Sequence, residues 1–113
     1  MKRLILIATL TVMLAAIGSV AFAGSAGPTT ISTVHFMDSG VVLFYIDANH
    51  NDAPACASYG PRFAINGTTA GGKVQLSGLL ASYAMGKKIF IYGTGDCVAY
   101  SGTETVSYFY TID

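Results

Sequence analysis

The N-terminal segment most constrains the fold, because it takes part of the chain out of the folded domain. A basic pair at residues 2–3 is followed by an apolar run over residues 4–17, and small residues then lead to Ala21-Phe22-Ala23. This three-part order with an A-x-A site predicts a signal peptide of residues 1–23, cleaved after Ala23. An uncleaved transmembrane anchor is the alternative, but the run is short for a spanning helix and no positively charged stop follows it.

Export predicts a periplasmic or secreted protein with no membrane span in its mature part. Residues 24–113 remain, enough for a single domain. Without Lys2 and Arg3, four basic residues face six acidic ones, a net charge of −2. A weakly acidic chain with so few cations lacks the electrostatic footprint of a nucleic-acid binder and has no polybasic patch for anionic lipid.

The two cysteines, Cys56 and Cys97, both lie in the mature part. An oxidising compartment makes a Cys56–Cys97 disulfide the expected state. It would close a loop of about 42 residues, worth about 4 kcal/mol on the chain-entropy model. Two free thiols or a metal pair are the alternatives, but neither cysteine lies in a CxxC, and neither histidine has ligand spacing to them.

The mature chain shows strand patterns and one helix pattern. Residues 24–28 are small and are expected to form a mobile leader. Alternation, β-branching and flanking turn residues predict five strands, at Thr29–Met37, Val41–Ile46, Arg62–Asn66, Ile89–Tyr92 and Val106–Ile112. Val41–Ile46 is continuously apolar, which favours a strand buried on both faces. In the last strand, Val106, Tyr108, Tyr110 and Ile112 are expected to share one side.

A helix is expected over Lys73–Met85, because apolar residues recur there at helical spacing, at Leu76, Leu79, Leu80 and Tyr83. Gly86 follows as its C-terminal cap. The resulting order, β-β-β-α-β-β, is that of the OB-fold, so a mainly β, OB-like five-stranded barrel over 24–113 is the predicted architecture. An open α+β sheet with the helix on one face is the competing arrangement.

No catalytic constellation is present in the sequence. It has no G-x-S-x-G or H-E-x-x-H motif, and a stapled domain of this size is a poor candidate for an enzyme. His35 lies on a predicted strand, whereas His50 lies in a loop within reach of Asp47 or Asp52. We therefore expect no catalytic residues and no cofactor.

Two loop patterns resemble ligand sites only weakly. Asp47–Asp52 resembles the start of a calcium loop, but its sixth position is not glycine and its twelfth, Ser58, is not glutamate. A polar turn explains the segment, so no metal is expected. Gly71-Gly72-Lys73 lacks P-loop spacing, and a loop before the helix explains its glycines.

Seven tyrosines and no tryptophan give the chain its aromatic character. Most lie on predicted strands or the helix and are expected to pack in the core or on the barrel surface. Tyr59 and Tyr100 lie in loops beside the cysteines, where ring and hydroxyl suit sugar binding or a protein interface. The predicted ligand contacts are Tyr59, Arg62, Tyr100, Asn49 and Asp52.

Three pieces of the chain carry a resemblance to a known family: Leu79–Lys88, the strand that leads into Cys97, and Glu104–Tyr110. They resemble small secreted proteins related to the pentameric B subunit of bacterial subtilase cytotoxin, and the similarity extends from about Thr30 to Asp113. The resemblance implies an OB-type fold with a helix between the third and fourth strands, and an intramolecular disulfide. It also implies a ring of five subunits that binds cell-surface glycans and carries a toxic A subunit.

The leading functional hypothesis is therefore an exported, non-enzymatic binding module that recognises glycans as a homopentamer, with a toxin A subunit as partner. The alternative is a monomeric periplasmic or secreted protein that binds or inhibits another protein and has no sugar affinity. A small hydrolase is the least favoured hypothesis, because no catalytic constellation is found.

Overall fold

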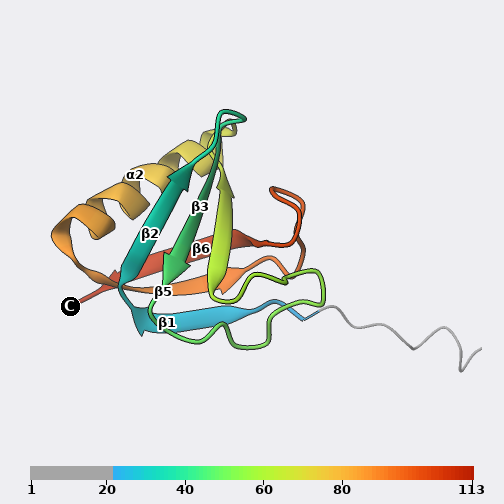
Figure 1. Ribbon diagram of the computed structural model, residues 1–113. Helices are drawn as coiled ribbons and strands as arrows, with labels where there is room; N and C mark the ends of the chain where they lie inside the picture. Colours follow the sequence, from blue (N-terminus) through green and yellow to red (C-terminus); the bar gives the residue numbers. More distant parts are fainter. Residues whose placement is uncertain (1–21) are drawn as a thin grey trace, which may run out of the picture.

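The computed structural model describes residues 22–113, so most of the expected signal peptide, residues 1–21, lies outside the described residues. The described chain forms one six-stranded sheet with a single helix between the fourth and fifth strands (Figure 1). The elements are β1 (Ser25–Thr29), β2 (Ile31–Phe36), β3 (Val41–Ile46), β4 (Arg62–Asn66), α2 (Ala70–Met85), β5 (Lys88–Gly93) and β6 (Glu104–Ile112). No helix in this part of the chain is long and apolar enough to cross a membrane. A mainly β fold with one helix is thus confirmed.

The N-terminal end of the described chain differs from expectation. Residues 24–28 do not form a mobile leader, because β1 begins at Ser25 and pairs antiparallel with β5. Ala26 in β1 is fully buried in the core. Small residues leave room for this close approach, which is why a segment with few large side chains still forms a strand. The sheet consequently has six strands rather than five.

The strand order is β1-β5-β6-β4-β3-β2, so the two edge strands are consecutive in the chain, separated only by Thr30. All neighbours are antiparallel except β4 and β6, which pair in parallel over two residue pairs, Phe63–Glu104 and Ala64–Thr105. In Figure 1 the β2–β3–β4 part runs steeply across the β1–β5–β6 part. The chain thus folds into two strongly crossed groups of strands joined by a short parallel contact.

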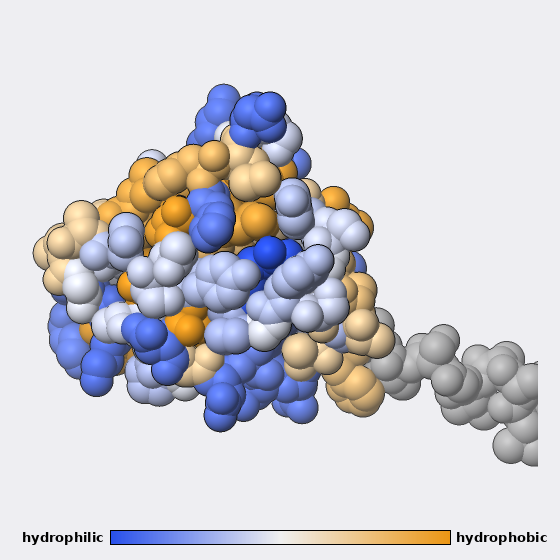
Figure 2. Space-filling view, viewed as in Figure 1, coloured by the Kyte–Doolittle hydropathy of each residue, from blue (hydrophilic) through white to orange (hydrophobic). Residues whose placement is uncertain are grey.

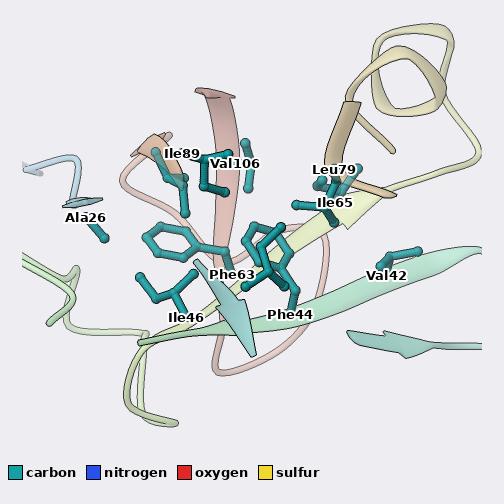
Figure 3. Close-up of a cluster of buried hydrophobic side chains, with 11 residues drawn as sticks. Ala26, Val42, Phe44, Ile46, Phe63, Ile65, Leu79, Ile89 and Val106 are labelled. Atoms are coloured by element: carbon teal, nitrogen blue, oxygen red, sulfur yellow. The ribbon is translucent and has the colours of Figure 1, made fainter. Parts of the chain in front are cut away.

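The main hydrophobic core lies between these groups and the helix (Figure 3). It joins side chains from every element of the fold, with Phe44, Phe63, Ile65, Leu79, Ile89 and Ile91 the largest wholly buried apolar ones. Alternate residues of β3 face this core, and on the opposite side Val41 and Leu43 are buried with Ala64 of β4. The prediction that Val41–Ile46 is buried on both faces is confirmed.

The helix begins earlier than its predicted start at Lys73, because Thr69 caps it: its hydroxyl accepts a hydrogen bond of 2.9 Å from Gly72 N. Gly72 is therefore inside the first turn, packed so closely on the Asn66 carbonyl that no side chain fits there. Gly86 ends the helix in the left-handed conformation, as predicted.

Only half of the predicted apolar face of the helix is buried. Leu79 is buried and Leu76 is partly buried, whereas Leu80 and Tyr83 are exposed. Val74 and Met85 are exposed as well, and Figure 2 shows apolar surface where α2 lies. The helix contacts the sheet mainly at β4, β2 and β6, so one narrow stripe is enough to pack it.

The Cys56–Cys97 disulfide is present, with the two Cα atoms 6.1 Å apart. It ties the long loop before β4 to the loop after β5, and no free cysteine remains. Both loops contribute few residues to the main core, so the covalent link supplies the cohesion that packing does not.

Candidate functional site

Three of the five predicted ligand residues come together beside the start of β4. The Arg62 guanidinium lies over the Tyr59 ring, 4.1 Å from its centroid, and 5.6 Å from the centroid of Tyr100. Its Nε donates a hydrogen bond of 2.7 Å to the Thr103 hydroxyl. We call Tyr59, Arg62 and Tyr100 the arginine cluster. Residues far apart in the sequence are thus joined by cation–π contacts.

The arginine cluster is built around a buried charge. Arg62 is only 9% exposed, and no carboxylate among residues 22–113 pairs with it. Its Nη2 atom is buried without a hydrogen-bond partner in the described chain. The ring faces of the two tyrosines therefore provide much of its electrostatic compensation. Tyr59, which is 56% exposed, is the member that a ligand can reach directly.

Asn49 and Asp52 lie apart from this cluster, in the long loop between β3 and β4. Asn49 lines a shallow hollow with Gly60 and Pro61, the two residues that separate Tyr59 from Arg62. Asp52 is exposed and adopts a left-handed backbone conformation with φ of 51°. Among residues 22–113, no three acidic, histidine or cysteine side chains are grouped in a way that would hold a metal ion.

A second aromatic surface lies on β5 and β6, on the side of the strands that faces away from the core. We call Phe90, Tyr92, Tyr108 and Tyr110 the tyrosine face. Phe90 pairs across the strands with Tyr110, and Tyr92 pairs with Tyr108. The ring centroids of these pairs are 5.8 and 4.8 Å apart, and both pairs are stacked. Tyr108 and Tyr110 are 52% and 47% exposed, so this stack is open to solvent.

The tyrosine face depends on an extra residue in β6. Tyr92 is opposite Tyr108, but the next residue, Gly93, is opposite Val106, so Ser107 is unpaired and the alternation shifts by one. Val106 therefore faces the core while Tyr108 faces solvent. The prediction that these two side chains share one side is wrong, because simple alternation takes no account of a bulge.

The hydroxyls of the tyrosine face interact electrostatically. The pKa of Tyr110 is raised above its ordinary value, first by desolvation and then by the neighbouring Tyr92 and Tyr108. Its neutral form is thereby favoured, which keeps it a hydrogen-bond donor over a wide pH range. The surface therefore offers apolar ring faces bordered by neutral donors and acceptors.

The sequence predicts core or barrel-surface positions for the tyrosines of this face and does not mark them as a site. The signal that identifies them is the spacing of two aromatic pairs, Phe90 with Tyr92 and Tyr108 with Tyr110, each two residues apart. Side chains at that spacing share one face of a strand. What the sequence does not state is that β5 and β6 are neighbours in this register.

A buried acid–histidine pair lies at the other end of β6. His50 Nε2 is 2.6 Å from Glu104 Oε1, and both side chains are almost wholly buried. His50 pairs with neither Asp47 nor Asp52, the acids within its reach along the sequence, but with an acid 54 positions away. No hydroxyl or thiol of residues 22–113 hydrogen-bonds to this ring, so the pair lacks the nucleophile of a catalytic triad there.

Comparison of this chain with family models, with curated proteins and with solved structures finds no match. The site must therefore be interpreted from its own geometry.

Proposed function

We propose that this protein is an exported, non-enzymatic binding module that recognises glycans through the tyrosine face. The observation that carries the proposal is the open stack of Tyr108 and Tyr110 with Tyr92 and Phe90, on strands held rigidly by the core. Its family resemblance to toxin B subunits is the second support.

Exposed tyrosines suit a sugar for a physical reason. The C–H faces of a sugar ring stack on an aromatic ring, and the phenol hydroxyl hydrogen-bonds to the sugar hydroxyls. The stacked rings lose little conformational freedom on binding because their neighbours already hold them. The arginine cluster, with Asn49 and Asp52 in the loop nearby, is the second candidate contact surface.

The proposal includes an OB-like barrel as the scaffold. Its support is that the sheet's two edge strands, β1 and β2, are consecutive and separated by one residue, Thr30. A continuous segment of residues 25–36 therefore borders both ends of the sheet. Counted as one bent strand, that segment restores the five-strand order β-β-β-α-β-β of an OB-fold.

A homopentamer that carries a toxin A subunit is the assembly that the resemblance implies. The exposed apolar side chains of α2, Val74, Leu80 and Met85, support a protein contact on this surface. Five weak sugar sites on one ring would gain avidity over a single site. The same helix surface also favours the alternative function, a monomeric protein-binding or inhibitory role without sugar affinity.

A glycan array probed with the exported protein tests the proposal. For any glycan that binds, Tyr108→Ala is expected to weaken binding at least about tenfold, as truncation of a central aromatic contact does. Tyr83→Ala is the matched control, because Tyr83 is an exposed tyrosine on α2. Loss of binding with Tyr59→Ala instead would move the site to the arginine cluster.

Two results would contradict the proposal. If no glycan binds, or if Tyr108→Ala and Tyr59→Ala both leave binding unchanged, sugar recognition by these surfaces is wrong. Light scattering after size exclusion then separates the alternatives, since a mass near five protomers supports the ring and a monomer favours the protein-binding role.

A further inference from the structure

The carboxylate of Glu104 is the most completely buried acidic group in the described chain, with 0% exposure. Its Oε1 atom contacts His50 Nε2 at 2.6 Å. Its Oε2 atom accepts two backbone hydrogen bonds, from Gly24 N at 2.9 Å and from Gly95 N at 2.8 Å. The carboxylate therefore joins the N-terminal end of β1 to the loops on either side.

The surroundings of Glu104 leave no space for side chains at two positions. A Cβ atom on Gly24 would collide with the Glu104 carboxylate and the His50 ring, and one on Gly93 would collide with the same carboxylate. Gly93 N also donates a hydrogen bond of 2.8 Å to Gly24 O. Gly24 is thus held tightly on both its nitrogen and its carbonyl.

Among residues 22–113, no lysine or arginine side chain pairs with the Glu104 carboxylate. His50 Nδ1 is buried and has no hydrogen-bond partner among residues 22–113. A protonated ring would bury an unpaired, charged N–H at that atom, whereas a neutral ring with its proton on Nε2 leaves only an unpaired acceptor there, which costs less. A neutral His50 leaves the Glu104 carboxylate without a cation, a costly arrangement for a buried charge.

The missing cation can come from the chain itself. Cleavage after Ala23 is the predicted processing step, and Gly24 would then be the first residue of the mature protein. Water hydrolyses the Ala23–Gly24 peptide bond, which leaves a carboxylate on Ala23 and an amine on Gly24, and the amine takes up a proton. The atom that acquires this charge is the nitrogen that already lies 2.9 Å from Glu104 Oε2.

We propose that Glu104 and His50 form a receptor for the α-ammonium group of Gly24, so that signal-peptide removal completes a buried ion pair and anchors β1 in the sheet. In the uncleaved chain the same nitrogen is a neutral amide, and the carboxylate is not neutralised. Processing then stabilises the folded domain as well as releasing it. Glycine at position 24 is required because a Cβ atom there would collide with both the Glu104 carboxylate and the His50 ring.

The test begins with the protein exported from the full-length chain in a bacterium. Intact mass and N-terminal sequencing are expected to give Gly24 as the first residue. Limited acylation near pH 7 then measures the reactivity of the α-amine, which exceeds that of lysine at this pH because its ordinary pKa is about 8. We expect slow labelling of Gly24 in the folded protein and fast labelling in urea, with Lys73 and Lys88 as internal references.

Substitutions supply the second arm of the test. Glu104→Gln is expected to increase the labelling rate of the Gly24 amine and to raise the unfolding equilibrium constant on the order of 100-fold. Asp113→Asn is the matched control, because Asp113 forms an exposed ion pair with Lys87 and should change neither quantity. If Glu104→Gln does not fold, the labelling of the unsubstituted protein still shows whether the Gly24 amine is docked.

Three results would overturn the proposal. A mature protein that begins at a residue other than Gly24 would place no ammonium at this site. An amine labelled as fast in the folded protein as in urea would show that it is not docked. Equal labelling rates in a folded Glu104→Gln variant and in the unsubstituted protein would show that the carboxylate does not hold it.

Discussion

The outer sides of the two strand groups differ in how far other side chains cover them. On β3 and β4, Val41, Leu43 and Ala64 face away from the main core and yet are buried, because Met37, Ala99 and Tyr100 pack over them. We call this surface the covered face. On β5 and β6 the corresponding surface is the tyrosine face, whose Tyr108 and Tyr110 remain about half exposed.

This difference separates residues that stabilise the fold from residues available to a ligand. Aliphatic side chains stabilise the fold when they leave water, and here Met37, Ala99 and Tyr100 cover them. Tyrosine tolerates an open surface because its hydroxyl stays hydrated while its ring packs against its neighbours. The proposed binding surface is therefore the one whose aromatic side chains stay uncovered.

The largest expected effect comes from releasing the segment that covers β3 and β4. Replacing both cysteines, Cys56→Ser with Cys97→Ser, removes the link across 41 positions and is expected to lower the free energy of unfolding by about 4 kcal/mol. Urea unfolding measures this loss. Hydrogen exchange should show faster exchange at Ala99, whose amide bonds to the Thr105 hydroxyl, than across Phe90 and Tyr110.

Uniform acceleration of exchange over both surfaces would contradict this prediction. It would mean that the disulfide supports the whole sheet and that the covered face has no separate dependence on it. The same variant should retain any ligand binding that belongs to the tyrosine face.

A matched pair of alanine substitutions comes next. Leu43 on the covered face is 3% exposed, and Leu43→Ala is expected to cost about 2–4 kcal/mol because it leaves a cavity. Tyr108→Ala removes a larger side chain but is expected to cost about 1 kcal/mol or less, because only its stacking with Tyr92 is lost. Urea unfolding of both variants compares them directly. Equal losses would show that the tyrosine face is structural.

Local sequence patterns predicted much of the fold. Val41–Ile46 and Arg62–Asn66 match β3 and β4 residue for residue, and Gly86 ends the helix as expected. These elements can be predicted because apolar patterning and a helix-ending glycine are local features of the sequence. The strand β1 was missed because Ser25–Thr29 contains no large apolar residue, and its pairing with β5 is a tertiary contact.

The candidate site was predicted less completely for a related reason. Chemistry and loop position alone point to Tyr59, Arg62 and Tyr100, and these three side chains lie together in the fold. The tyrosine face depends on the bulge at Ser107 and on strand neighbours, neither of which local alternation contains. The pairing of His50 with Glu104 joins two loop ends that only the folded chain brings together.

The smallest expected effect concerns the tyrosine hydroxyls, which are present on the tyrosine face and not among the buried side chains of the covered face. The pKa of Tyr110 is raised, chiefly by desolvation and then by Tyr92 and Tyr108, so the folded state holds its proton more tightly than the unfolded state. That contribution to stability is complete below the unfolded pKa of about 10 and is lost as pH rises through the higher folded value. Absorbance of the phenolate should therefore show a late step in the alkaline titration.

Tyr110→Phe is expected to remove that late step, whereas Tyr83→Phe, on the exposed surface of α2, should leave it in place. A bound glycan should delay the step further, because a ligand on the tyrosine face desolvates the hydroxyl and favours its neutral form. If a glycan binds but leaves the titration curve unchanged, its site lies away from the tyrosine face, for example at the arginine cluster on the covered side of the molecule. The titration thus reports which of the two outer surfaces a ligand occupies without any substitution in it.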